Sequence, residues 1–105
     1  MSKKKYQVIT LCGSTKFKDE FLKVQSELTL DGYIVISVGV FGHTDGEADE
    51  ETKIMLDDIH KRKIDMSDGI FVVNKDGYIG ESTKSEIEYA KSNGKFIKYL
   101  ENPIK

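Results

Sequence analysis

The sequence predicts an α/β protein, and three observations support this. Four short apolar or β-branched segments alternate with three segments whose apolar residues recur at helical spacing. Glycine-bearing turns follow the first and third apolar segments. The 105 residues show no internal repeat or interdomain linker, so one domain is expected over residues 1–105. Because strand–helix–strand crossovers are right-handed, we expect a parallel four-stranded sheet of order 2-1-3-4, in a three-layer sandwich of the flavodoxin or Rossmann type.

The expected elements follow from these patterns in order along the chain. The expected strands are Tyr6–Cys12, Ile34–Val38, Ile70–Val73 and Phe96–Leu100. The unbroken apolar run of the third is typical of a strand buried on both faces. The first helix is capped by Gly13-Ser14-Thr15 and ends at Asp31-Gly32, and the second runs from about Asp49 to Met66. The third is capped by Ser82 and Thr83 and ends at Asn93-Gly94.

Apolar spacing indicates which helix faces are buried. One face of the first helix is formed by residues at steps of four, three and four: Phe17, Phe21, Val24 and Leu28. The inner arc of the second is expected to carry Met55, Leu56, Ile59 and Met66. The long loop Gly39–Glu47 contains His43 and Asp45 and is expected to close over a ligand. In such sheets ligands bind at the switch point, here between the first and third strands.

Composition excludes several classes of function. The net charge of −2 gives no reason to expect nucleic acid or an acidic membrane as a partner, and no apolar run approaches the roughly 18 residues that span a bilayer. A single cysteine, Cys12, cannot form an internal disulfide, which together with the lack of a recognisable signal peptide favours the cytoplasm. The two histidines and the cysteine are far apart in the sequence, so we expect neither a metal site nor a cofactor.

The third helix and its loop carry a resemblance to a known family. The residues concerned are Gly77-Tyr78-Ile79-Gly80-Glu81-Ser82-Thr83, then Glu86 and Ala90, with Ser67-Asp68 before the third strand and Ile9–Thr15 at the first. This pattern resembles the nucleoside 2-deoxyribosyltransferase-like superfamily, which includes deoxyribosyltransferases and nucleoside 5'-monophosphate N-glycosidases. The resemblance spans nearly the whole chain. It is specific around Thr83–Ala90 and loose between Val38 and Leu56.

The resemblance implies cleavage or exchange of the N-glycosidic bond of a (deoxy)nucleoside or its 5'-monophosphate. It makes Glu86 the nucleophilic carboxylate that attacks the anomeric carbon. It also implies a homodimer or larger homo-oligomer, because family members complete their pocket with a neighbouring subunit. Tyr89, Lys91 and Asn93 of the third helix are candidates for that surface.

Glu86 also has a purely structural interpretation. Thr83-Lys84-Ser85-Glu86 matches a capping box, in which the glutamate at the third helical position bonds the backbone amide of the threonine. A glutamate in the first turn is favoured by the helix dipole as well. Spacing alone favours the cap, and the family resemblance favours the nucleophile.

A nucleobase leaves poorly as an anion, so an acid is needed to protonate it. The family's aspartate would stand eight residues before Asp68, where this chain has His60. Either His60 takes the role of the acid, since its ordinary pKa is near neutrality, or Asp57 does, one turn earlier on the same helix face. His60 also fits a helix-surface histidine between Asp57 and Lys61.

The remaining candidates are expected to bind substrate. Gly13 and the hydroxyl residues Ser14, Thr15, Ser82 and Thr83 lie at two helix N-termini, which favour a 5'-phosphate, although simple capping explains each one alone. Gly80 stands where the family has an acidic residue, so Asp76 or Glu81 is the candidate for the sugar hydroxyls. Tyr78 is expected either to stack on the base or ribose or to cover the core.

Two other functions fit parts of the sequence. A non-catalytic nucleotide-binding or sensing module would explain His60 and Gly80 at the positions of the family's acidic residues. An NAD-cleaving domain similar to TIR domains shares a parallel α/β architecture and a catalytic glutamate, but the Ser-Thr-x-x-Glu arrangement after the glycine loop argues against it.

Overall fold

A computed structural model describes residues 5–39 and 49–102 of the chain. Its strands are β1 (Val8–Gly13), β2 (Ile34–Ile36), β3 (Gly69–Val73) and β4 (Phe96–Tyr99). Its helices are α1 (Lys18–Leu30), α2 (Glu50–Asp65) and α3 (Glu81–Ser92), with short 3-10 turns η1 (Thr15–Phe17) and η2 (Lys75–Gly77). β2 is shorter than expected, and β1 begins two residues later than expected. The expected ligand-closing residues His43 and Asp45 lie outside the described residues.

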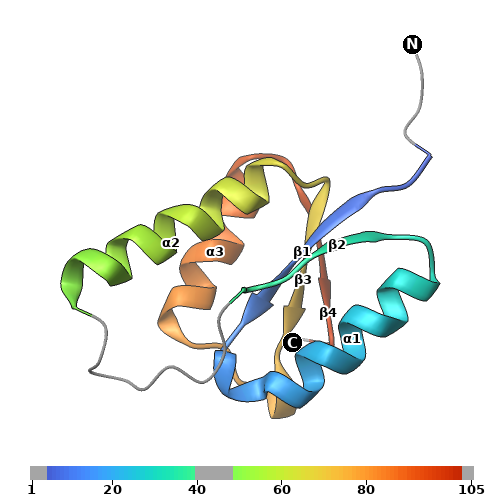
Figure 1. Ribbon diagram of the computed structural model, residues 1–105, viewed down its shortest axis with the longest axis horizontal. Coiled ribbons are helices and arrows are strands. Elements are labelled where there is room, and N and C mark those ends of the chain that lie inside the picture. Colours follow the sequence, from blue (N-terminus) through green and yellow to red (C-terminus); the bar gives the residue numbers. More distant parts are fainter. Residues whose placement is uncertain (1–4, 40–48, 103–105) are drawn as a thin grey trace.

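The sheet confirms the predicted topology. All four strands are parallel and follow the order β2-β1-β3-β4, with Thr10 of β1 paired to Ile36 on one side and Ile70 on the other. Figure 1 shows α1 on one face of the sheet and α2 and α3 on the other. The switch point therefore lies between β1 and β3, and their carboxyl ends open on the same side.

Alternation along the strands divides the core into two layers. Ile9 and Leu11 of β1 pack with Phe21, Val24 and Leu28 of α1. The next residue, Cys12, points to the opposite face and packs beneath α2 and α3. Its neighbours there are the buried residues Ile64, Ile70, Val72, Ile87 and Ala90. The same alternation that builds the core thus directs a thiol towards the two helices that carry the candidate site residues.

The predicted inner face of α2 is wrong for three of its four residues; the fourth, Leu56, is half-buried and lines the cleft. Met55, Ile59 and Met66 are 51%, 41% and 66% exposed. The buried residues are instead His60 and Ile64, which lie one turn apart. Ile64 packs in the core layer between the sheet and the two helices α2 and α3. The helix is therefore rotated about its axis relative to the predicted orientation, and this rotation buries His60 too. Hydropathy alone missed the rotation because it treats a histidine as a surface residue.

The start of α3 also differs from the prediction. Gly80 is the N-cap residue, and no side chain caps the helix within the part of the chain that the structure describes. Ser82 and Thr83 are therefore residues of the first turn, not caps. The predicted end is confirmed: Asn93 is the C-cap, and Gly94 adopts a φ of 72°. Asp68 has a structural contact, because its Oδ2 accepts a 2.7 Å hydrogen bond from the Val8 amide.

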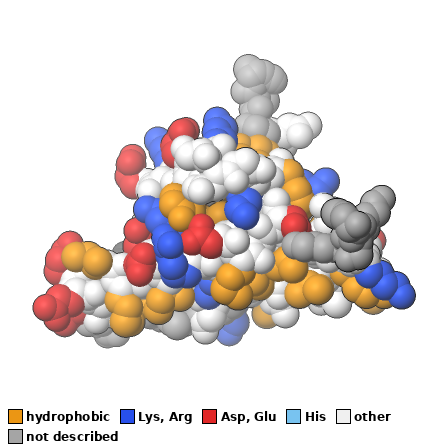
Figure 2. All heavy atoms as spheres, turned by 90° about the horizontal axis from the view of Figure 1, so that it is seen from above, with side chains coloured by type: hydrophobic (Ala, Val, Ile, Leu, Met, Phe, Trp, Pro, Cys, Tyr) orange, Lys and Arg blue, Asp and Glu red, His pale blue; other side chains and the backbone are white. Residues whose placement is uncertain are grey.

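The surface shows mixed charge. On the face in Figure 2, acidic and basic side chains are interspersed, with apolar side chains between them. Several of the charges pair along one helix, as Arg62 does with Asp58 and Asp65 of α2. Among residues 5–39 and 49–102, no helix has both the length and the apolar character needed to cross a membrane.

Candidate functional site

A cleft of about 410 Å³ opens at the switch point. The turn after β1 forms one wall, the start of α3 a second, and α2 a third. Eleven of the twelve residues expected at the site line it: Gly13, Ser14, Thr15, Asp57, His60, Tyr78, Gly80, Glu81, Ser82, Thr83 and Glu86. The fold therefore brings together residues that lie up to 73 positions apart, from Gly13 to Glu86.

Asp76 is the exception, because it does not line the cleft. It adopts a φ of 56° in η2, and its backbone amide donates a 2.8 Å hydrogen bond to Glu101 Oε2. The neighbouring Asn74 is buried and exchanges two hydrogen bonds with the backbone of Glu101. Asp76 thus belongs to a turn that is tied to the end of the chain after β4.

Glu86 is not a capping residue. It is the sixth residue of α3 and lies in the second turn, so it cannot be the third residue after the N-cap as the capping box requires. The residue is 8% exposed, and its side chain lines the cleft. The capping-box interpretation and the first-turn placement of Glu86 were both wrong. The N-cap is Gly80, three residues before Thr83, so the helix begins three residues earlier than those predictions assumed.

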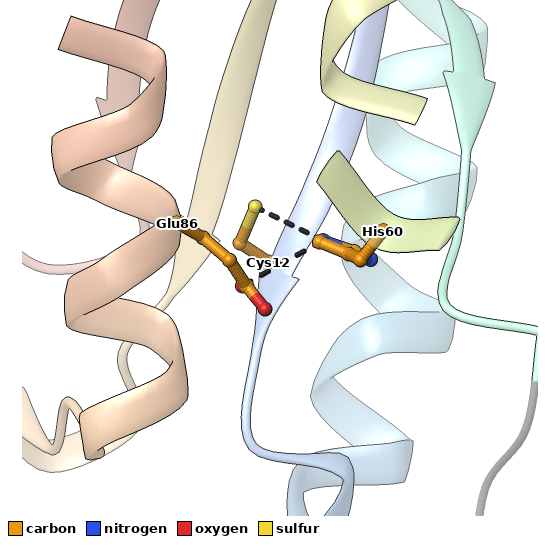
Figure 3. Close-up of side chains that lie close together, drawn as sticks. All are labelled: Cys12, His60 and Glu86. Carbon is orange, nitrogen blue, oxygen red and sulfur yellow. Dashed lines mark hydrogen bonds and ion pairs between the residues drawn. The ribbon is translucent and has the colours of Figure 1, made fainter. Parts of the chain in front are cut away.

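Three side chains from three elements lie close together (Figure 3), and two of them, His60 and Glu86, line the cleft. His60 Nε2 of α2 lies 3.3 Å from Cys12 Sγ of β1 and 3.6 Å from Glu86 Oε1 of α3. All three residues are buried. We call this group the Cys12–His60–Glu86 cluster. Sequence reasoning missed the contribution of Cys12. The available signal was the alternation of the strand, which directs Cys12 to the face of the sheet opposite that of Leu11.

Burial dominates the protonation of the cluster. Burial is the largest cause that raises the pKa of Glu86, and the negative charge of Asp57 adds to it, while the Cys12 hydrogen bond and Lys61 act in the opposite sense; together they bring this pKa to about 7. Burial lowers the pKa of His60 to about 4, with the positive charge of Lys63 adding to the effect and Asp57 opposing it. At pH 7 the imidazole is therefore neutral, and its 3.6 Å approach to Glu86 is a polar contact and not an ion pair.

The thiol of Cys12 is also held in its neutral form. Burial raises its pKa well above the ordinary value, and the adjacent carboxyl of Glu86 raises it further. A thiol in this state is a weak nucleophile, since the thiolate is the reactive form. Without a ligand, Cys12 therefore acts as a small apolar residue that can donate a weak hydrogen bond.

Positive groups also line the cleft. Lys53 and Lys63 line it, and neither was expected from the sequence. Lys63 Nζ donates a 2.9 Å hydrogen bond to the Ser37 carbonyl, and burial lowers its pKa. The first-turn amides of α3 also open on the cleft, because Gly80 supplies no side chain to cap them. Amides of this kind favour an anion.

Ser14 and Asp57 already have local partners. Ser14 Oγ accepts a 3.3 Å hydrogen bond from the Lys16 amide and so caps η1, whereas α1, which this turn was expected to cap, has Phe17 as its N-cap and no side-chain cap among the described residues. Asp57 Oδ2 lies 3.2 Å from Lys61 Nζ, and its side chain is 44% exposed. The pairing is a solvated one between residues four apart on α2, which leaves Asp57 accessible from the cleft.

Tyr78 forms part of the rim. Its ring meets Phe17 edge to face at 6.0 Å, and Lys16 Nζ lies 3.8 Å from the ring centre. The ring also fills the space beside Gly80, where an added Cβ would lie 3.1 Å from the tyrosine hydroxyl oxygen. A larger residue at Gly80 would therefore make a close contact with the Tyr78 side chain, which favours glycine at this position.

The comparisons with known proteins add no family to this picture. No family model matches the chain, and no curated protein matches it.

Proposed function

We propose that this protein cleaves or exchanges the N-glycosidic bond of a (deoxy)nucleoside or nucleoside 5'-monophosphate, with Glu86 as the nucleophile. The resemblance of the Gly77–Ala90 motif to nucleoside 2-deoxyribosyltransferase-like proteins suggested this activity. The observation that carries it is the position of Glu86. Its carboxyl group is buried at the floor of a ligand-sized cleft and takes no part in capping the helix.

In the proposed first step, one oxygen of the ionised Glu86 carboxylate forms a bond to the anomeric carbon of the sugar. The carbon–nitrogen bond breaks, and its electron pair leaves with the base, which takes a proton from an acid. In the second step, water adds to the anomeric carbon, the ester bond to Glu86 breaks, and a proton returns to the acid. If a second base replaces water, the same two steps transfer the sugar.

Asp57 is the better candidate for the acid. Retaining glycosidases hold their two carboxyl groups about 5–5.5 Å apart, with the reacting bond between them. His60 Nε2 lies closer to Glu86 Oε1 than this, at 3.6 Å, and is neutral at pH 7. Asp57 lies one turn earlier on α2 and lines the cleft. To act as the acid it must carry the proton while Glu86 is ionised as the nucleophile, so the two carboxyl groups would share one proton. His60 then orients the nucleophile.

The phosphate of a 5'-monophosphate fits the lining of the cleft that carries positive charge and free amides. Lys53 and Lys63 supply positive charge, and the uncapped amides of α3 supply hydrogen-bond donors. Ser82, in the first turn, also lines this region. These features favour a phosphorylated substrate over the free nucleoside.

The test is to measure free base after incubation of the protein with nucleosides, deoxynucleosides, their 5'-monophosphates and NAD. Glu86→Gln should abolish release, because an amide keeps the shape of the side chain but cannot act as the nucleophile. Glu88→Gln is the matched control, since Glu88 is exposed on the same helix, and it should retain wild-type rates. Full activity in Glu86→Gln would refute the assignment.

A second pair of variants separates the two candidate acids. Asp57→Asn should slow release of natural bases by about 10²–10⁴-fold and spare substrates whose leaving group needs no proton. The neighbouring Asp58→Asn, on the exposed side of α2, is its control. A loss of this kind in His60→Gln, with Asp57→Asn unaffected, would give the role of acid to His60. Nucleotide binding without any release would favour a sensing module, and release from NAD alone would favour the NAD-cleaving alternative.

A further inference from the structure

The Cys12–His60–Glu86 cluster combines a cysteine, a histidine and a glutamate. Thiolate, imidazole and carboxylate groups are the side-chain ligands that bind zinc in proteins. One ligand atom of each residue, namely a sulfur, a ring nitrogen and a carboxylate oxygen, lies within 4.8 Å of the other two. The residues come from β1, α2 and α3, and their side chains point toward one another (Figure 3). Strands and helices hold such ligands more rigidly than loops do.

We propose that this cluster is a Zn²⁺ site, with Cys12 Sγ, His60 Nε2 and a Glu86 carboxylate oxygen as ligands. The proposal concerns metal binding and stands whether or not the protein cleaves nucleosides. Among residues 5–39 and 49–102, no second group of three such side chains comes together in this way.

The distances between the ligand atoms support this. Bond lengths of about 2.3 Å to sulfur and about 2.0–2.2 Å to nitrogen or oxygen give tetrahedral edges of about 3.6 Å between sulfur and nitrogen and about 3.4 Å between nitrogen and oxygen. The cluster has 3.3 Å between Sγ and Nε2, and 3.6 Å between Nε2 and Oε1. Each differs from the ideal edge by a few tenths of an ångström, which small side-chain rotations can remove.

The donor set selects the class of metal. A thiolate and an imidazole suit zinc and its neighbours in the transition series, whereas magnesium and calcium require oxygen ligands. Binding needs the thiolate form of Cys12, so the thiol proton passes to solvent as the ion enters. The positive ion takes the place of that proton, so the negative charge of the buried thiolate is balanced.

The site has an entry path and an open position. His60 and Glu86 line the cleft, whereas Cys12 is fully buried behind them. An ion that enters from the cleft can therefore meet all three ligands and keep its fourth position towards the cleft. Three protein ligands and one exchangeable position are typical of reactive or regulated zinc sites, whereas structural sites are closed by four ligands.

The experiment uses the full chain without a histidine tag, freed of metal by a chelator and titrated with Co²⁺ as a spectroscopic substitute for zinc. We expect saturation at one ion per chain, with a near-ultraviolet thiolate-to-cobalt charge-transfer band that added Zn²⁺ removes. Cys12→Ser should lose this band. Removal of a residue that only orients a metal ligand weakens metal binding by about 10–100-fold. His60→Gln removes a ligand itself, so we expect it to bind Zn²⁺ at least about 10-fold more weakly than the wild type does.

Glu88→Gln is the control and should bind Co²⁺ as the wild type does, because Glu88 is exposed on α3. Circular dichroism shows whether each variant is folded, and His60→Gln remains a sufficient test if Cys12→Ser does not fold. The absence of a charge-transfer band in the wild type would overturn the proposal. Equal zinc affinity in the wild type and in folded His60→Gln would overturn it too.

Discussion

Replacing Glu86 with glutamine is expected to change how the stability of the protein depends on pH. The native pKa of Glu86 is raised from 4.5 to about 7, so between these values the native state binds more protons than the unfolded state. Stability therefore falls as pH rises through this interval. A shift of this size corresponds to about 3 kcal/mol, since each pKa unit is worth about 1.4 kcal/mol.

His60 contributes a slope of the opposite sign. Its native pKa is lowered from 6.5 to about 4, so over this interval the unfolded state binds more protons, and stability rises with pH by about 3 kcal/mol. In the wild type the two effects largely cancel between about pH 4.5 and 6.5. Both groups experience the charge of Asp57, and Lys61 acts on Glu86 while Lys63 acts on His60, so these residues stay unchanged in the test.

Glu86→Gln should uncover the contribution of His60. Its free energy of unfolding should rise by about 3 kcal/mol from pH 4 to 6.5 and then level off, whereas that of the wild type should stay nearly constant between about pH 4.5 and 6.5. His60→Gln should show the reverse, a fall between about pH 4.5 and 7. Urea denaturation followed by circular dichroism, in the presence of a chelator, measures both profiles, with Glu88→Gln as the control. Profiles for wild type and Glu86→Gln that run parallel across this range would refute the reasoning.

Three further predictions follow from the same structure. Gly13→Ala should destabilise the protein by about 1–3 kcal/mol in urea denaturation, because Gly13 has a φ of 147° and an added Cβ would lie 2.8 Å from the Val73 carbonyl oxygen; Gly32→Ala, at a φ of 98° in open space, should cost less. A nucleoside 5'-monophosphate should bind more tightly than its nucleoside by about 1.5–3 kcal/mol per charge-assisted hydrogen bond in calorimetry, and equal affinities would count against the phosphate site. Light scattering at micromolar concentration should show a dimer or larger assembly, and a monomer of 11.9 kDa would contradict the expected self-association.

The architecture could be predicted because it depends on patterns that are local in sequence. The β-branched run at Ile70–Val73 and the glycine turns that separate strands from helices are sufficient to indicate a parallel sheet. The rotation of α2 could not be predicted in this way. Met55, Ile59 and Met66 are more apolar than His60, yet His60 is buried, because the helix is fixed by the packing of Ile64 and by polar contacts that hydropathy does not represent.

The candidate site was predictable where a motif joined neighbouring residues and not where the fold joined distant ones. Motif residues such as Tyr78 and Thr83 do line the cleft, whereas Asp76 in the same loop does not, and its backbone amide bonds the Glu101 carboxylate. The contact of Cys12 with His60 joins residues 48 positions apart, so their distance in the sequence gave no reason to expect it. Tyr89, a candidate for a subunit surface, bonds Arg62 and Asp65 within the chain, a pairing that its place in the sequence did not indicate.

One electrostatic feature of the cleft bears on both proposals. Glu86 is a buried carboxyl group with no cation in ion-pair contact among the described residues, because its close neighbour His60 is neutral at pH 7. A positive charge that arrives beside it therefore gains more than it would in water. A sugar acquires such a charge only in an oxocarbenium-like transition state, so the gain accelerates cleavage. Zinc brings a permanent charge and occupies the same oxygen, so a bound ion would leave Glu86 unable to attack.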